Sequence, residues 1–276
     1  MRAEQLWERA RGVSRSALAG GALVPLSTEV LEGGDAIAPF VLRRLLSAPP
    51  RHLRSGGPRA NPFLPWDLPL EVDRLDSGHV VLLNKYPVQD CHLLVISDGW
   101  QPQSGWLAAA DWQAVSRVAA DTGGLWFFNS SAVAGASQPH RHLQLLPRRR
   151  GETSCPLAAH YQAQLAGERP APPWRHALSR RRDPQTGSDL EPLYREHAHR
   201  LGLGEPERDG APRAAYNLLF DDDWFLTVVR EREHGAGFSV NGLGFAGYLL
   251  CTGSSDLDWM RRHGPWRLLE SVALPS

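Results

Sequence analysis

The segment 129–144 constrains the fold more than any other part of the chain. It contains the small residues Gly135-Ala136-Ser137, and from His142 onward it alternates polar and leucine residues. Such alternation predicts a β-strand on which His140, His142 and Gln144 share one face, while Leu143 and Leu145 share the other. Neighbours on one face of a strand lie about 6.5–7 Å apart, so these three groups would reach different oxygens of one polyphosphate.

The remaining apolar patterns predict an α+β fold. Helical spacing is found over residues 5–18, 37–46, 106–121 and 191–201. Strand-like runs cover 79–83, 92–96, 125–128, 143–146, 216–220, 224–229 and 238–241, and the segment 242–251 is expected to open a closing helix. This order predicts an antiparallel sheet with its helices on one side. There is no βαβ rhythm and no P-loop, which argues against Rossmann and Walker nucleotide folds.

Composition shifts divide this single elaborated domain into four regions. Residues 1–60 are expected to form a helical region packed on the core, and residues 61–147 the catalytic core. Residues 148–212 form an insert rich in arginine and proline with one helix, and residues 213–276 supply strands and a helix that complete the core.

Charge and cysteine content exclude several classes of protein. Thirty basic and thirty acidic residues give zero net charge, which argues against a nucleic-acid or membrane-surface binder. The chain has no apolar run long enough to span a membrane and no signal peptide, so a cytoplasmic protein is expected. Cys91, Cys155 and Cys251 are too scattered for a disulfide framework or zinc knuckle. The only lysine is Lys85, where a compact ammonium was kept in an arginine-rich chain.

Three interpretations of the His140/His142 pair compete on the residues alone. Both histidines are structural, or they bind zinc, or one of them is a nucleophile in phosphoryl transfer. The zinc hypothesis lacks an obvious third ligand, because the nearest acidic candidate is Glu152. The small-residue loop favours the nucleophile, because backbone N–H groups there can approach an anion without obstruction.

The segment GASQPHRHLQLLP, with LLNKYPV before it and YNLLF…SVNGLGFAGYLL after it, resembles the ATP adenylyltransferases of the diadenosine tetraphosphate phosphorylase type. This family belongs to the transferase branch of the histidine triad superfamily, and the similarity runs from about residue 61 to 250. It implies a histidine-triad-like fold. The segment Val228–Glu231 departs from the family's Val-Pro-Arg-Ser pattern, and Tyr86 replaces a common phenylalanine.

The resemblance implies a role for each matching residue. His142 is the nucleophile, its other ring nitrogen held by a backbone carbonyl, His140 orients the loop or contacts phosphate, and Gln144 binds a phosphate oxygen without titrating. The implied substrate-binding residues are Asn84, Lys85, Asn129, Gly135, Ala136, Ser137, Gln138, Gln144, Asn241, Gly242, Leu243, Tyr248 and Thr252, with Arg59 or Arg54 as a further basic contact.

The implied reaction is reversible phosphorolysis of diadenosine tetraphosphate to ATP and ADP, through an AMP-histidine intermediate. The expected partners are diadenosine tetraphosphate, ATP, ADP and phosphate, with no nucleic acid or membrane. No cofactor is required for the chemistry, although Mg²⁺ is expected to accompany the nucleotide. A sugar-1-phosphate nucleotidylyltransferase and a non-catalytic nucleotide-binding regulator are the alternatives.

Other motifs favour structural roles. The tryptophans considered for stacking on a base are Trp66, Trp106, Trp126 and Trp224, although large aromatic residues more often lie in a core. Residues 221–223, three aspartates, are interpreted as a hairpin turn rather than a divalent metal site. The arginine triplets 148–150 and 180–182 are interpreted as solvated. His197 and His199 lie on a predicted helix, where such a pair diverges, and both are expected at the surface.

Overall fold

A computed structural model describes residues 2–32, 34, 37–47, 61–149 and 151–276. Its main feature is an eight-stranded sheet in the order β3-β4-β5-β7-β6-β9-β10-β8, with every neighbouring pair antiparallel. These strands are β3 (Glu71–Leu75), β4 (His79–Leu83), β5 (Leu93–Ser97), β6 (Gly124–Asn129), β7 (His142–Pro147), β8 (His176–Arg180), β9 (Tyr216–Phe220) and β10 (Trp224–Val229). The predicted α+β class is confirmed, and the strands of regions 61–147 and 213–276 share one sheet.

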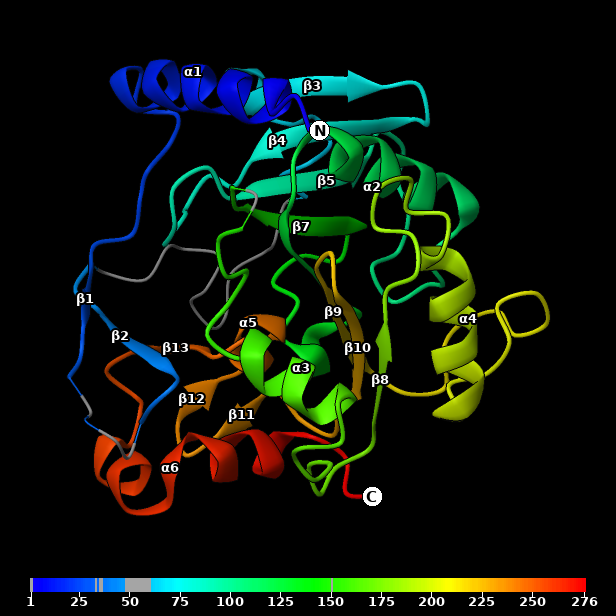
Figure 1. Cartoon of the computed structure of the whole chain (residues 1–276). Helices are drawn as coiled ribbons and strands as arrows, with labels where there is room; N and C mark the ends of the chain where they lie inside the picture. Colours follow the sequence, from blue (N-terminus) through cyan, green and yellow to red (C-terminus); the bar gives the residue numbers. More distant parts are fainter. Residues whose placement is uncertain (1, 33, 35–36, 48–60, 150) are drawn as a thin grey trace.

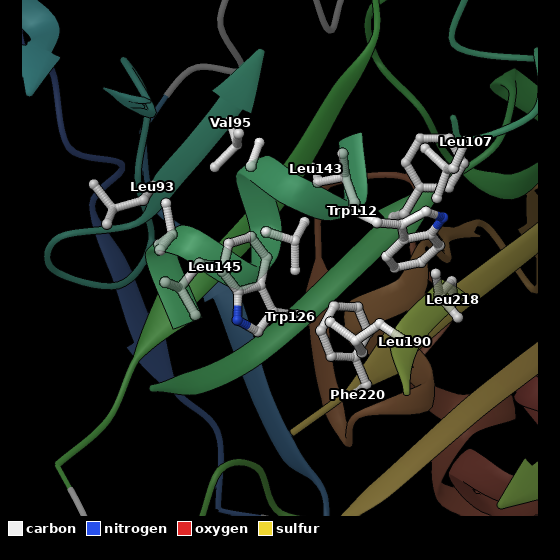
Figure 2. Packing of buried hydrophobic residues seen from close by; sticks show 14 of the residues in the cluster. Leu93, Val95, Leu107, Trp112, Trp126, Leu143, Leu145, Leu190, Leu218 and Phe220 are labelled. Atoms are coloured by element: carbon white, nitrogen blue, oxygen red, sulfur yellow. The ribbon is translucent and has the colours of Figure 1, made fainter. Parts of the chain in front are cut away.

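One face of this sheet packs against three helices. These are α1 (Gln5–Ala19), α2 (Ala109–Asp121) and α4 (Leu190–Arg200), whose apolar residues join the alternate side chains of the strands in one cluster. Leu143 and Leu145 of β7 point into this cluster near Trp126 and Phe220 (Figure 2), whose rings stack with centroids 5.9 Å apart. The leucine face of β7 is therefore the core face, as the alternation predicts.

The opposite face carries two separate apolar clusters. Over β6, β9 and β10 it packs against α3 (Ala158–Leu165), α5 (Gly242–Phe245) and α6 (Leu257–Val272), and against β13 (Tyr248–Cys251). Over β4 and β5 it packs against Phe63 and Trp66. Helices thus lie on both faces of the sheet, and the expectation that they are confined to one side is wrong, because the C-terminal elements fold back over half of the second face.

A second sheet joins distant parts of the chain. β1 (Thr28–Val30) pairs with β2 (Val41–Leu45), and β2 runs parallel to β13. The helix predicted over 37–46 is wrong, because backbone pairing with residues 248–251 sets the conformation of this segment. Figure 1 shows this small sheet beside the large one, with α1 and α6 at opposite ends of the molecule. The remaining short elements are η3 (Leu68–Leu70), η4 (Ala132–Ala134), β11 (His234–Gly235) and β12 (Phe238–Ser239).

The C-terminal segment differs from the prediction. Residues 242–251 form the short α5 and the strand β13, and the closing helix is α6 further along. Asp256 caps α6 by accepting a hydrogen bond from Trp259 N, and Gly264 and Pro265 kink the helix at a backbone φ of 75°. That Gly-Pro pair interrupts the helical pattern and hides α6 in the sequence. No helix among the described residues combines the length and apolar character needed to cross a bilayer.

Candidate active site

His142 lies at the start of β7, between the two apolar clusters of the second sheet face. Its register partner is Ile96 of β5, and Gln144 pairs with Leu94 on β5 and Phe127 on β6. Ile96 and Leu94 belong to the cluster under Phe63, whereas Phe127 belongs to the C-terminal cluster. The two polar side chains therefore lie along the boundary between the two clusters, where the Phe63 ring approaches the His142 ring with centroids 5.5 Å apart.

The His142 ring is buried and held in one orientation. Its Nδ1 donates to the His140 carbonyl over 2.8 Å, which is the backbone hydrogen bond expected from the sequence. No described residue hydrogen-bonds Nε2. Burial lowers the pKa of His142 to about 4, so the ring is neutral at physiological pH. A neutral imidazole with its Nδ1 proton held this way presents the Nε2 lone pair, as a nitrogen nucleophile requires.

Gln103 fixes the main chain of His142, and sequence reasoning missed it. Its side-chain Oε1 accepts from His142 N over 2.8 Å, while Nε2 donates to the carbonyls of His142 (3.2 Å) and Asn129 (2.8 Å). The Gln103 side chain thus bridges β6 and β7 at Asn129 and His142, where their ladder of backbone hydrogen bonds has ended. Nothing local to residues 98–106 signals this role, because it depends on strands that come later in the chain.

His140 is fully buried and uses both ring nitrogens. Nε2 donates to Ser97 O over 2.8 Å, and Nδ1 lies 3.2 Å from the amide nitrogen of Asn61. The edge-on rings of Phe63 and Trp100 lie 5.7 and 5.5 Å from it. With both nitrogens engaged, His140 orients the surrounding loops and offers its carbonyl to His142.

A second buried histidine, His92, orients Gln144 and was also missed. Asn84 Nδ2 lies 3.1 Å from His92 Nδ1, and His92 Nε2 lies 3.0 Å from Gln144 Oε1. Burial lowers the pKa of His92 to about 4, so its ring is neutral. An amide nitrogen can only donate to Nδ1, and the single ring proton therefore sits on Nε2 and is donated to Gln144 Oε1. The amide of Gln144 is thereby fixed with its NH₂ group facing away from His92.

The small-residue loop differs in detail from the expected anion cradle. The N–H groups of Gly135 and Ala136 donate to the carbonyls of Ala132 and Ser131, both over 2.9 Å, and so hold the loop together. No described residue accepts a hydrogen bond from the N–H groups of Ser137 and Gln138. Gln138 is nine-tenths buried and its Oε1 has no partner among the described residues. The donors that remain for an anion are therefore at the end of the loop.

The loop packs directly on the C-terminal part of the chain. Gly135 has a φ of 84°, and a Cβ there would lie 2.6 Å from Cβ of Asn241, so both backbone and contact require glycine. Asn241 Oδ1 caps α5 through Leu243 N. Asn129 Oδ1 accepts from Gly242 N over 2.8 Å. The predicted residues on both sides of the insert are therefore brought together.

Other predicted residues have partners of their own. Lys85 Nζ lies 3.1 Å from Asp67 Oδ2, and both side chains are about two-fifths exposed. The hydroxyl of Tyr248 lies 3.1 Å from Arg148 Nη2. Thr252 is exposed and bonds within its own turn to Ser254 and Ser255. Leu243 packs against the C-terminal cluster. Arg59 and Arg54 lie outside the described residues.

The alternative motifs have mixed outcomes. Asp221 Oδ1 accepts from the N–H groups of Asp223 and Trp224 in the β9–β10 hairpin, as predicted for a turn. Trp126 and Trp224 are buried in the core, whereas Trp100, which was not predicted, is 53 % exposed beside His140. The described residues hold no group of three or more His, Cys, Asp or Glu side chains arranged for a metal ion.

The surface assignment of His197 is wrong. This side chain is fully buried, with Ser179 Oγ 2.9 Å from Nε2 and Thr227 Oγ1 3.0 Å from Nδ1. The helix does separate it from the exposed His199, but packing of α4 over β8 and β10 covers the His197 side.

Two family profiles match this chain. The profile of the Ap4A phosphorylase N-terminal domain matches residues 1–162, and that of the ATP adenylyltransferase C-terminal domain matches residues 170–275. The chain belongs to the Ap4A phosphorylase family.

Solved structures show the same fold. A crystal structure of yeast Ap4A phosphorylase Apa2 matches at a TM-score of 0.74 with 19% sequence identity. The match covers 100% of this chain and 96% of the yeast chain. The complexes of Apa2 with AMP and with Ap4A match at the same TM-score with 20% and 19% identity, covering 100% of this chain and 99% of each. A search of the curated proteins finds no match.

Proposed function

We propose that this protein catalyses reversible phosphorolysis of diadenosine tetraphosphate, with His142 as the nucleophile. Membership of the family supports the activity. The observation that carries the assignment is the neutral, buried His142 ring, with Nδ1 bonded to His140 O and the lone pair of Nε2 available for reaction.

The first step forms a nitrogen–phosphorus bond. His142 Nε2 attacks the α-phosphorus of diadenosine tetraphosphate, the bond from that phosphorus to the bridging oxygen breaks, and ATP leaves with the electron pair. The Nδ1 proton stays on the hydrogen bond to His140 O, so the adduct carries a stabilised positive ring. The NH₂ group of Gln144, turned away from His92, is placed to donate to a nonbridging oxygen as its charge grows.

The second step releases the AMP group. An oxygen of inorganic phosphate attacks the same phosphorus, the nitrogen–phosphorus bond breaks, and ADP leaves while His142 returns to its neutral form. In reverse, ADP adenylylates His142 with release of phosphate, and ATP accepts the AMP to form diadenosine tetraphosphate. Lys85 and the loop donors at Ser137 and Gln138 are proposed phosphate contacts. Mg²⁺ would enter with the nucleotide, and the substrates are those of the cytoplasmic nucleotide pool.

Labelling with ADP that carries radioactive α-phosphorus tests the proposal, because in the reverse direction ADP adenylylates His142 and phosphate leaves. We expect an acid-labile, alkali-stable label on the wild-type protein and on His199→Ala, a matched control in the exposed member of the other HxH pair. His142→Ala should carry no label. Label that persists in His142→Ala would refute the nucleophile, and an unlabelled wild-type protein that still binds ADP would favour a regulatory protein.

Acceptor choice tests the remaining alternative. The labelled enzyme is mixed with phosphate, ATP or galactose 1-phosphate, and the products are separated. We expect label in ADP and in diadenosine tetraphosphate. Transfer to the sugar phosphate alone would instead identify a sugar-1-phosphate nucleotidylyltransferase.

A further inference from the structure

Arg230, directly after β10, is a buried cation with an unusual set of partners. Its side chain is 3 % exposed, and its guanidinium donates only to neutral oxygens. These are the carbonyls of Ala134 (3.3 Å), Arg232 (2.7 Å), Val240 (2.8 Å) and Val272 (3.2 Å), and the side-chain oxygen of Asn217.

Other buried arginines of the chain are paired with carboxylates. Arg141 lies 2.8 Å from Asp111, and Arg181 lies 2.8 Å from Asp189, with all four side chains at most 8 % exposed. Among the described residues, no ion pair involves Arg230. Glu233 acts on it only at longer range and hydrogen-bonds Ser239 instead. Buried charges in folded proteins are normally paired, so an unpaired guanidinium needs an explanation.

The charge is maintained in spite of this burial. Burial lowers the pKa of Arg230 to about 10, which still leaves the side chain protonated at neutral pH. Its five hydrogen bonds satisfy the N–H donors, and the Phe245 ring, 5.3 Å from Cζ, and the Val272 carbonyl at the C-terminal end of α6 contribute only partial negative charge. The folded protein therefore carries a net positive charge in its interior at this point.

The position of Arg230 connects this charge to the candidate site. Its Nη1 donates to Ala134 O, in the loop that ends at Ser137 and Gln138. Asn217, which accepts from Arg230, donates to the same carbonyl and to Asn129 Oδ1, both over 2.8 Å. Asn129 in turn accepts from Gly242 N. Arg230 thus lies under the loop, at the junction of the two family domains.

We propose that Arg230 is a positioning residue whose unpaired charge is balanced by the polyphosphate of the bound nucleotide, acting through the loop 131–138. The inference rests on the proposed function. Through Arg230, the C-terminal domain would attract the negative charge of the bound nucleotide, although Arg230 itself would not contact the substrate. A purely structural arginine would weaken binding of every nucleotide alike when it is replaced.

Binding of two ligands of different charge separates these roles. AMP and α,β-methylene-ATP share the adenosine and the α-phosphorus, and neither can adenylylate His142 through a cleaved α–β bridge. Dissociation constants are measured calorimetrically in EDTA for the wild type, Arg230→Met and Arg230→Lys. The attraction increases with the charge of the ligand. Arg230→Met should therefore raise the dissociation constant of α,β-methylene-ATP by about ten-fold more than it raises that of AMP. Arg230→Lys keeps the charge and should restore most of that ratio.

The outcomes are distinct. If Arg230→Met weakens the binding of both ligands equally, the role of Arg230 is structural and the inference is overturned. The same conclusion follows if Arg230→Lys changes the ratio of the two dissociation constants as much as Arg230→Met does. Each ratio is taken within one variant, so partial destabilisation cancels. Arg230→Gln, which can still donate to Ala134 O, replaces the Met variant if that protein does not fold. A wild type that binds neither ligand would instead overturn the proposed function itself.

Discussion

The chain contains two His-x-His pairs, and each includes a buried ring whose pKa is strongly lowered. Burial lowers the pKa of His142 to about 4 and that of His197 to about 3, so both rings are neutral. They differ in their ring nitrogens. His197 contacts a hydroxyl at each nitrogen, whereas His142 is bonded only at Nδ1 among the described residues. A depressed pKa therefore does not distinguish the proposed nucleophile from a structural histidine, whereas a ring nitrogen without a hydrogen-bond partner among the described residues does.

Replacing His142 and His197 by alanine should have the largest and most different effects, one on activity and the other on stability. His142→Ala should reduce phosphorolysis by at least about a thousand-fold, because the covalent route is lost. His197→Ala leaves two hydroxyls and a cavity in the core, and should lower the free energy of unfolding by about 2–4 kcal/mol. Turnover per folded molecule should stay near that of the wild type. Phosphate-dependent ATP release and urea melts measure the two effects, and loss of turnover in folded His197→Ala would contradict the distinction.

Anchoring of the main chain gives the next largest effect. Gln103→Leu removes the three hydrogen bonds that hold His142 and Asn129, and the backbone groups it leaves are buried. We expect single-turnover adenylylation of His142 to slow by about 30-fold, since small displacements of a reacting group are costly. The exposed Gln113 of α2 provides a control, because Gln113→Leu should leave the rate unchanged. An unchanged rate in Gln103→Leu would show that His142 is held by β7 alone.

Local sequence patterns predict some features of the candidate site but not the residues that hold it in place. The pattern from His140 to Leu145 predicts the strand and which side chains share a face, because those properties depend on immediate neighbours. Gln103, His92 and Arg230 act through partners 26 to 96 positions away. No local pattern reports such distances, and their roles follow only from the order of strands in the sheet.

The errors in the fold have the same origin. Residues 37–46 have helical spacing, yet Val41–Leu45 forms a strand because Tyr248–Cys251 supplies a parallel partner. His197 faces away from His199, as the helical geometry requires, but the same geometry turns it toward β8 and β10. In both cases the local pattern was read correctly, but contacts with distant parts of the chain determined the final structure.

The orientation of Gln144 should have a smaller effect than the anchoring of His142. His92→Phe removes the donor to Gln144 Oε1, so the amide is free to turn its oxygen toward a phosphate. We expect adenylylation to slow by about ten-fold, close to the energy of one charge-assisted hydrogen bond. His92→Asn, which can donate from a shorter side chain, should recover part of the rate. The matched change at the second pair, Thr227→Val, removes a contact of His197 and should leave adenylylation unaltered. Equal rates in His92→Phe and the wild type would disconnect His92 from the reaction.

The smallest expected change in rate comes from pH, and it distinguishes folding from chemistry. His92, His142 and His197 have folded-state pKa values of about 4, 4 and 3, below the ordinary value of 6.5. The unfolded chain therefore binds more protons below pH 6.5, and each histidine should cost about 1.4 kcal/mol of stability per pH unit as the pH falls toward its folded value. Stability that these groups provide is complete above pH 6.5.

The His142 ring stays neutral in the folded protein between pH 8 and 5.5. The internal phosphates of diadenosine tetraphosphate also keep their charge over this range. The rate of single-turnover adenylylation by diadenosine tetraphosphate should therefore change by less than about two-fold between these pH values. His197→Ala should flatten the stability curve and leave the rate profile alone. A rate that falls with a midpoint near 6.5 while the protein remains folded would mean that His142 is not shielded from protonation, and the difference between the two pairs would then lie elsewhere.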